Sequence, residues 1–171
     1  MSRAPATIAL SKDLASGFMC AGRLLSHGEL EQAGLSLHRG WQIARDAVLG
    51  RALTPRGLRF RHRSARVIVG ADAPAQAVQI DSPGLDDPTS WLAHPELMSI
   101  LHLHFAGILG ESTCYFAPRQ GILVAAVRSS ADHPALRAWA DETSAGGGIC
   151  AGALEYHRGF PRQLRQAVTR V

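Results

Sequence analysis

The stretch TCYFAPRQGILVAAV, residues 113–127, decides the fold that we expect for this chain. Two apolar segments, rich in aromatic and β-branched residues, flank the turn-forming sequence Pro118-Arg119-Gln120-Gly121. Apolar runs on either side of a turn that contains proline and glycine are typical of a β-hairpin. We therefore predict strands over 113–117 and 122–127, within a small and mostly antiparallel central sheet.

Further strands are expected upstream of this hairpin. Residues 58–63 alternate between arginine and other side chains, and 66–69 form an apolar run rich in β-branched residues. These patterns predict one bent strand or two short strands between 58 and 70, and a similar run predicts another strand over 77–80. Residues 81–90, DSPGLDDPTS, are dense in turn formers and predict a loop that could act as a hinge.

The flanking regions carry apolar residues at helical spacing. This spacing predicts helices over 12–26 and 29–53, which would pack together as an N-terminal helical hairpin over about 11–53. The same reasoning predicts helices over 94–109, over 133–142, and from Pro161 to the C-terminus, whereas 149–157 fit helix or strand equally. The expected fold class is α+β: one domain over 1–171, with a mixed α/β region over about 57–171.

Charge is distributed unevenly along the 171 residues. The basic residues are 17 Arg and one Lys, and the net charge of +4 hides strong local differences. Residues 1–70 carry a net charge of +7, residues 71–155 carry −7, and residues 156–171 carry +4. Basic segments on both sides of an acidic middle indicate either contact with an acidic partner or head-to-tail association of copies, so a homo-oligomer is one possibility.

The segment RGLRFRHRSAR, residues 56–66, holds five of these arginines. On a strand, alternate side chains share a face, so Arg59, Arg61 and Arg63 would project together about 6.6–7 Å apart, flanked by Arg56 and Arg66. That spacing is close to the separation of neighbouring phosphates on one nucleic-acid strand, and guanidinium groups bind phosphate well. The row predicts polyanion binding by a small binding or regulatory protein, with nucleic acid as the first expected partner and an acidic protein surface as the second.

A second basic stripe is expected in the predicted C-terminal helix. Arg158, Arg162 and Arg165 follow i, i+4, i+7 spacing, which places them on one helical face. We therefore include them among the candidate polyanion-binding residues.

Solvation or internal pairing is the alternative role for the arginines. Charged residues on a strand often mark a solvated edge that discourages aggregation. The acidic middle of the chain also offers intramolecular partners, namely Asp81, Asp86, Asp87, Glu96 and Glu142. No helix-turn-helix, zinc-finger or aromatic RNA-binding signature supports a particular nucleic-acid-binding module.

A pair of residues offers a catalytic alternative. Cys114 lies on the first predicted strand of the hairpin and His133 follows the second, so closure of the hairpin could bring thiol and imidazole together as nucleophile and base. The stretch from Cys114 to His133 resembles the cysteine-then-histidine arrangement of cysteine-dependent glutamine deamidases. The resemblance implies a cysteine-dependent amidohydrolase, with Cys114 and His133 as the catalytic residues.

No cofactor and no metal are expected from the sequence. Complete phosphate-loop and nucleophile-elbow motifs are absent, and His102 and His104 would point about 200° apart on the predicted helix. The longest apolar runs are too short to span a bilayer, and Lys12 and Asp13 interrupt any signal-like segment. We expect a cytoplasmic protein that does not associate with membranes.

Overall fold

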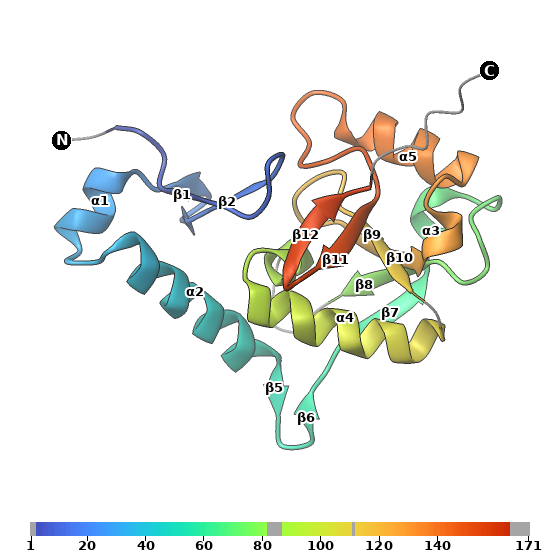
Figure 1. Cartoon of the computed structure of the whole chain (residues 1–171), viewed down its shortest axis with the longest axis horizontal. Coiled ribbons are helices and arrows are strands. Elements are labelled where there is room, and N and C mark those ends of the chain that lie inside the picture. The colour runs from blue at the N-terminus through green and yellow to red at the C-terminus, as the bar shows by residue number, and fades with distance from the viewer. Residues whose placement is uncertain (1–2, 82–86, 111, 165–171) are drawn as a thin grey trace.

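A computed structural model describes residues 3–81, 87–110 and 112–164 of the chain. Its centre is a six-stranded sheet in the order β12-β11-β9-β10-β8-β7, in which every neighbouring pair is antiparallel (Figure 1). The strands of this sheet are β7 (Arg61–Ser64), β8 (Val78–Asp81), β9 (Thr113–Phe116), β10 (Leu123–Val127), β11 (Leu154–His157) and β12 (Phe160–Gln163). The predicted α+β class and the mostly antiparallel sheet are confirmed.

The hairpin of β9 and β10 forms the middle of the sheet, as its sequence predicted. Val124 pairs with Phe116 and Ala126 pairs with Cys114, and all nine residues of the two strands are buried. Because side chains alternate between the two faces of a strand, one face contributes Tyr115 to one apolar cluster and the other face contributes Phe116 to a second cluster. The continuous apolar composition of these strands therefore reflects burial on both faces.

Helices cover both faces of the sheet. On one face lie α4 (Pro95–Leu109) and the 3-10 helix η1 (Pro88–Leu92), which bury Trp91, Leu101 and Phe105 against the sheet. On the other face, α5 (Pro134–Ser144) and the short helix α3 (Arg66–Val69) pack around Leu136. The helices predicted over 94–109 and 133–142 are thus present. Within the described ranges, no helix has both the length and the apolar character needed to cross a membrane.

The predicted N-terminal helical hairpin is wrong in its first half. Residues 7–24 form two β-hairpins, of β1 (Thr7–Ala9) with β2 (Ala15–Gly17) and of β3 (Met19–Cys20) with β4 (Arg23–Leu24). Ala21 and Gly22 adopt positive φ angles of 49° and 77° in the turn between β3 and β4, a conformation that a helix cannot contain. A helix would also have placed Gly17 and Gly22 in its interior, at a cost of roughly 1 kcal/mol each.

The second predicted helix divides into two. α1 (His27–Gln32) ends before Gly34, whose φ of +70° is typical of a residue that follows a helix. α2 (Leu37–Ala52) then begins at its own N-cap, Ser36, whose side chain accepts a hydrogen bond from the backbone N–H of Arg39. Gly34 and the N-cap Ser36 therefore interrupt an apolar stripe that looked continuous in the sequence.

Two further predictions are corrected near the ends of the sheet. The apolar run that begins at Arg66 forms α3 and not a strand, because the packing of the half-buried Ile68 and Val69 against the cluster around Leu136 overrides their β propensity. The C-terminal helix does not begin at Pro161, since residues 160–163 form β12, paired with β11. An edge strand tolerates proline. The remainder of that predicted helix, residues 165–171, lies outside the described residues, as do residues 82–86 of the predicted hinge.

Candidate functional site

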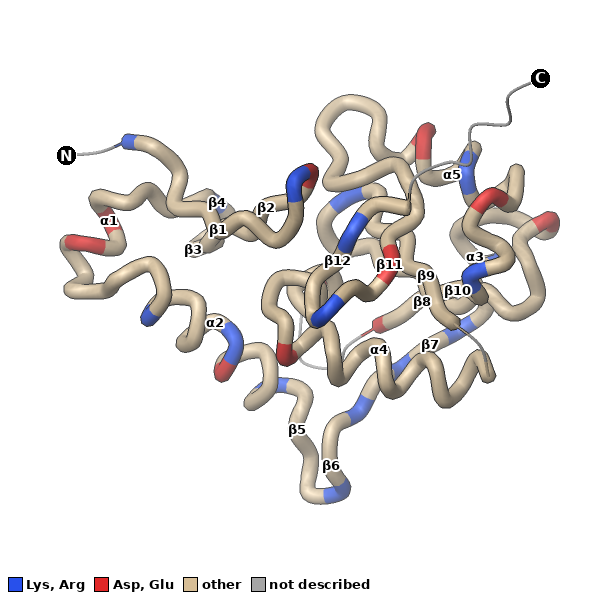
Figure 2. The backbone as a smooth tube through the Cα atoms, viewed as in Figure 1, with Lys and Arg blue, Asp and Glu red and all other residues tan. Residues whose placement is uncertain are grey.

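The arginine-rich segment forms one edge of the sheet and a hairpin next to it. β5 (Leu53–Thr54) and β6 (Gly57–Leu58) make a small hairpin that projects from the sheet, and the chain then enters β7 (Figure 1). All four residues of β7 are exposed. Figure 2 shows a line of basic residues that runs from the tip of this hairpin along β7 to α3. We call this surface the arginine edge; its members are Arg56, Arg59, Arg61, Arg63 and Arg66.

Aromatic packing fixes the direction in which the arginine edge faces. Phe60 lies 4.7 Å from Trp91 and 5.7 Å from Phe105 between ring centroids, and His62 lies 6.0 Å from Phe105. The intervening positions therefore face away from α4, as the alternation in the sequence predicted. In the strand register Arg61 is opposite Asp81, and Arg63 is opposite Gln79.

The arginine edge has few partners of its own. Arg63 Nε donates a hydrogen bond of 2.9 Å to Gln79, and Arg66 Nε donates one of 3.2 Å to the backbone carbonyl of Ala73. In the described ranges 3–81, 87–110 and 112–164, no ion pair joins an aspartate or glutamate to any of the five arginines.

Two of the acidic residues considered as internal partners are engaged elsewhere. Glu96 pairs with Arg45, and Asp87 Oδ1 accepts hydrogen bonds from the backbone N–H groups of Thr89 and Gly121. Asp86 lies outside the described residues. These three contacts remove Glu96 and Asp87 from the candidate partners of the arginine edge.

The C-terminal arginines lie at the opposite edge of the sheet. Arg162 on β12 donates from Nε to Glu155 at 2.9 Å, and Arg128 also pairs with Glu155. Arg158 occupies the turn between β11 and β12 with a φ of +51°, and Arg165 lies outside the described residues. With neighbouring strands about 4.8 Å apart, β12 and β7 are separated by roughly 24 Å, so the two basic stripes do not form one surface.

The geometry around Cys114 is unfavourable for a nucleophile. Its thiol is buried and donates a weak hydrogen bond of 3.5 Å to the carbonyl of Val127. Burial raises the pKa of the Cys114 thiol to about 12, more than nearby Arg128 lowers it, so the reactive thiolate is scarce at neutral pH. His133 is half-buried at the N-cap of α5, and its Nδ1 atom is buried without a hydrogen-bond partner.

The histidines of α4 point to different neighbours, as predicted for a helix. His102 stacks on Tyr156 with ring centroids 4.4 Å apart, whereas His104 lies 4.8 Å from Phe60. Among the residues that the structure describes, no three His, Cys, Asp or Glu side chains gather in a way that could hold a metal ion.

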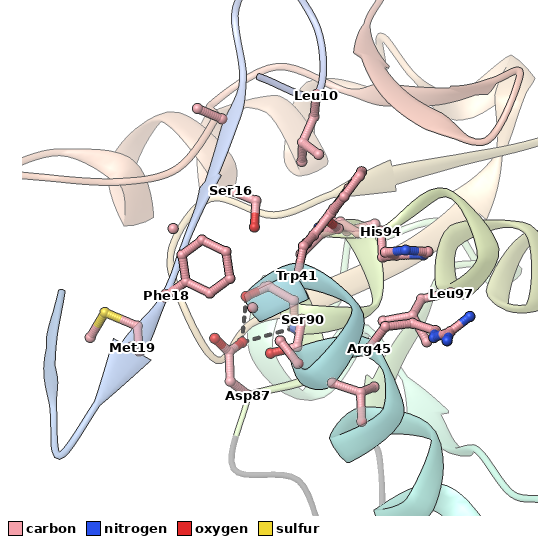
Figure 3. A pocket seen from close by; sticks show the side chains of 18 of the residues that line it. Leu10, Ser16, Phe18, Met19, Trp41, Arg45, Asp87, Ser90, His94 and Leu97 are labelled. Carbon is pink, nitrogen blue, oxygen red and sulfur yellow. Dashed lines mark hydrogen bonds between the residues drawn. The ribbon is translucent and has the colours of Figure 1, made fainter. Parts of the chain in front are cut away.

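A large apolar pocket lies on another part of the molecule, and the sequence did not reveal it. Its volume is about 690 Å³, and its walls come from the N-terminal hairpins, α2, η1 and the start of α4 (Figure 3). Phe18, Leu24 and Trp41 line it. The sequence predicted that Phe18 and Leu24 lie on one helix and Trp41 on the next, whereas residues 7–24 fold as β-hairpins and α2 carries Trp41.

Comparisons of this chain with models of protein families, with curated proteins and with solved structures gave no match. Any function must therefore be argued from the chemistry of the residues themselves.

Proposed function

We propose that this chain is a binding protein that holds a nucleic acid along the arginine edge. The observation that supports the proposal is a set of five exposed arginines on β7, on the segment before it and at the start of α3, none of which forms an ion pair among the described residues. Arg162, in contrast, pairs with Glu155, so an arginine of this sheet does pair internally where a carboxylate lies within reach.

The arrangement suits a phosphate backbone in three respects. The alternation along β7 directs Arg61 and Arg63 to one side, because Phe60 and His62 pack towards α4. Guanidinium groups bind phosphate through two parallel N–H groups, which an ammonium group cannot do. Each phosphate that an arginine neutralises also releases condensed counterions, which favours binding at low salt.

Sequence-specific recognition is not part of this proposal. Half or more of the protein contacts to nucleic acid go to phosphate and sugar, and those contacts position the partner without reading bases. The aromatic rings beside β7, such as Phe60, are engaged with Trp91 and α4 and so do not provide a stacking platform. We therefore expect affinity for nucleic acid with little preference for sequence.

The experiment is a fluorescence-anisotropy titration at low salt with labelled 20-nucleotide single strands and 20-base-pair duplexes. Polyglutamate serves as a competitor that carries a similar charge density without phosphates. The proposal predicts saturable binding that is weakened far more by unlabelled oligonucleotide than by polyglutamate. Absence of binding at low salt would overturn it, and equal competition by polyglutamate would assign the arginine edge to an acidic protein surface instead.

A further inference from the structure

The hairpin of β5 and β6 protrudes from the surface that carries the arginine edge. It extends away from the central sheet and from α4 (Figure 1). Its strand pairing runs from Thr54 and Gly57 near the tip to Ala52 and Arg59 at the base, where the backbone N–H of Arg59 donates to the carbonyl of Ala52 at 3.2 Å. Three residues, at about 3.3 Å each, separate this base from the turn Pro55-Arg56, so the ribbon is roughly 10 Å long.

The backbone at the tip of this hairpin is held by local contacts. The hydroxyl of Thr54 donates to the carbonyl of Gly57 at 2.7 Å and accepts from the backbone N–H of Arg56 at 3.2 Å. Pro55 fixes its own φ, and Gly57 has a φ of +99°, which favours glycine. Arg56 is therefore presented on an ordered turn, so its backbone loses little conformational entropy when a partner binds.

Positive charge lies at the tip of the hairpin and on both sides of its base (Figure 2). Between Asp46 and Asp72 the chain carries six arginines and no aspartate or glutamate. Arg51, in the last turn of α2, precedes the first strand, Arg56 occupies the turn, and Arg59 follows the second strand. All three are exposed, and in the described part of the chain none of them forms an ion pair.

This distribution of charge matches a double helix better than a single strand, because two phosphate backbones border each groove of a duplex. The major groove of B-form DNA is about 12 Å wide and about 8.5 Å deep, and it admits a two-stranded β-ribbon. The minor groove, about 6 Å wide, is too narrow for two strands whose backbones alone lie about 4.8 Å apart. The major groove of an RNA duplex is too narrow for side chains to reach its bases.

We propose that the β5–β6 hairpin enters the major groove of B-form DNA, where Arg51 and Arg59 bind phosphates on the two sides of the groove and Arg56 reaches the base edges. This inference rests on the proposed nucleic-acid binding and specifies its partner as duplex DNA. Arginine can donate two N–H groups to the O6 and N7 atoms of guanine. One such contact concerns a single base pair, so the preference for sequence remains small.

The first test compares a DNA duplex with an RNA duplex of the same sequence in anisotropy titrations at low salt. The DNA duplex should bind at least about tenfold more tightly, because only its major groove admits the hairpin. Equal affinities for the two duplexes would overturn insertion of the hairpin and leave nucleic-acid binding along the arginine edge intact. Absence of binding to either duplex and to a single strand would overturn both proposals.

Arg51 lies outside the arginine edge, so its substitution tests the inference separately. Arg51→Gln should weaken binding to the DNA duplex about tenfold and binding to a single strand less than about threefold, because a single strand has no second phosphate backbone. The matched control is Arg39→Gln, at an exposed arginine about 18 Å away along α2, which should change either affinity less than about threefold. Equal losses for duplex and single strand in Arg51→Gln would contradict contacts on two sides of the groove.

The contact of Arg56 is tested by changing one atom of the DNA. A duplex in which 7-deazaguanine replaces guanine lacks the N7 acceptor in the major groove, and it should bind about fivefold more weakly than the normal duplex. Arg56→Gln should bind the two duplexes equally. If the wild-type chain does not distinguish them, Arg56 does not reach the bases and the proposal fails. Displacement of the chain by netropsin, which occupies the minor groove, would also overturn it.

Discussion

Both edge strands of the sheet carry arginine, but the arginines of the two edges differ in whether they pair with a carboxylate. At one edge, Arg162 on β12 shares the carboxylate of Glu155 with Arg128, and the side chain of Glu155 is only 13% exposed. At the other edge, Arg61 and Arg63 on β7 have no carboxylate partner among the residues that the structure describes. The difference teaches that arginine content alone does not define a binding surface. What distinguishes β7 is that, among the described residues, its arginines form no ion pair with a carboxylate.

Removing the charge of the arginine edge should have the largest effect on binding. The triple variant Arg59/Arg61/Arg63→Gln is expected to lose at least about 100-fold in affinity for a 20-nucleotide strand at 50 mM salt, since charge-assisted hydrogen bonds contribute more than 1 kcal/mol each. The control is Arg128/Arg162→Gln at the other edge, which should lose less than about threefold. Anisotropy titrations measure both, and equal losses would erase the distinction between the two edges.

Phe60, which lies between Arg59 and Arg61, should contribute to the free energy of unfolding. Phe60 packs its ring against Trp91, His104 and Phe105. Because Phe60 is half-buried, Phe60→Ala should lower the free energy of unfolding by about 2 kcal/mol, somewhat less than for a fully buried phenylalanine. Urea denaturation followed by circular dichroism measures the change. Leu53→Ala, at a side chain that is 63% exposed, is the control and should change the free energy by less than about 0.5 kcal/mol.

The stability of the fold should depend on pH through Glu155, which pairs with Arg128 and Arg162. Burial opposes its ionisation, but hydrogen bonds from Arg128 and Arg162 outweigh burial and lower its pKa below the ordinary value of 4.5. A carboxylate whose pKa is lower in the folded chain stabilises the fold above pH 4.5 and loses that contribution as the pH falls through the folded-state pKa.

Glu155→Gln should therefore destabilise the chain by about 1 kcal/mol at pH 7, a modest amount because both arginines are about half exposed. The difference from the wild-type chain should be smaller at pH 3 than at pH 7. Urea denaturation at the two pH values measures it, and a difference that grows towards low pH would contradict the assigned role of the carboxylate.

The smallest expected effect lies within the arginine edge. Arg66 Nε is committed to the carbonyl of Ala73, so fewer of its N–H groups remain for a phosphate. Arg66→Gln should weaken oligonucleotide binding by less than about threefold, whereas Arg61→Gln should weaken it by about tenfold. Single-variant titrations at 50 mM salt compare the two. A larger loss of affinity for Arg66→Gln than for Arg61→Gln would place the main phosphate contacts near α3.

The sequence predicted the parts of the fold where local signals agree with burial. The hairpin of β9 and β10 has apolar runs around a clear turn, and α4 has a proline at its first turn and Gly110 at its C-cap. The helix predicted over 12–26 is wrong because short amphipathic segments fit both the helical and the strand period, and the positive φ at Ala21 is not visible in a sequence.

The candidate site was only partly visible in the sequence. The alternation along 59–63 predicted that the arginines share a face. In the structure Phe60 and His62 lie towards α4, on the other face. The location of Arg162 at the far edge could not be predicted, because strand order depends on long-range pairing. The burial of Cys114, which raises the pKa of its thiol, likewise depends on the helices that cover the sheet.

The salt dependence of oligonucleotide binding tests the central claim most directly. The observed association constant should fall linearly on a plot of its logarithm against the logarithm of salt concentration, between about 50 and 200 mM. The triple variant Arg59/Arg61/Arg63→Gln should reduce the magnitude of that slope by about 2 for a single strand, because three phosphate contacts are lost. An unchanged slope would contradict the account, since it would mean that no phosphate is bound at the arginine edge.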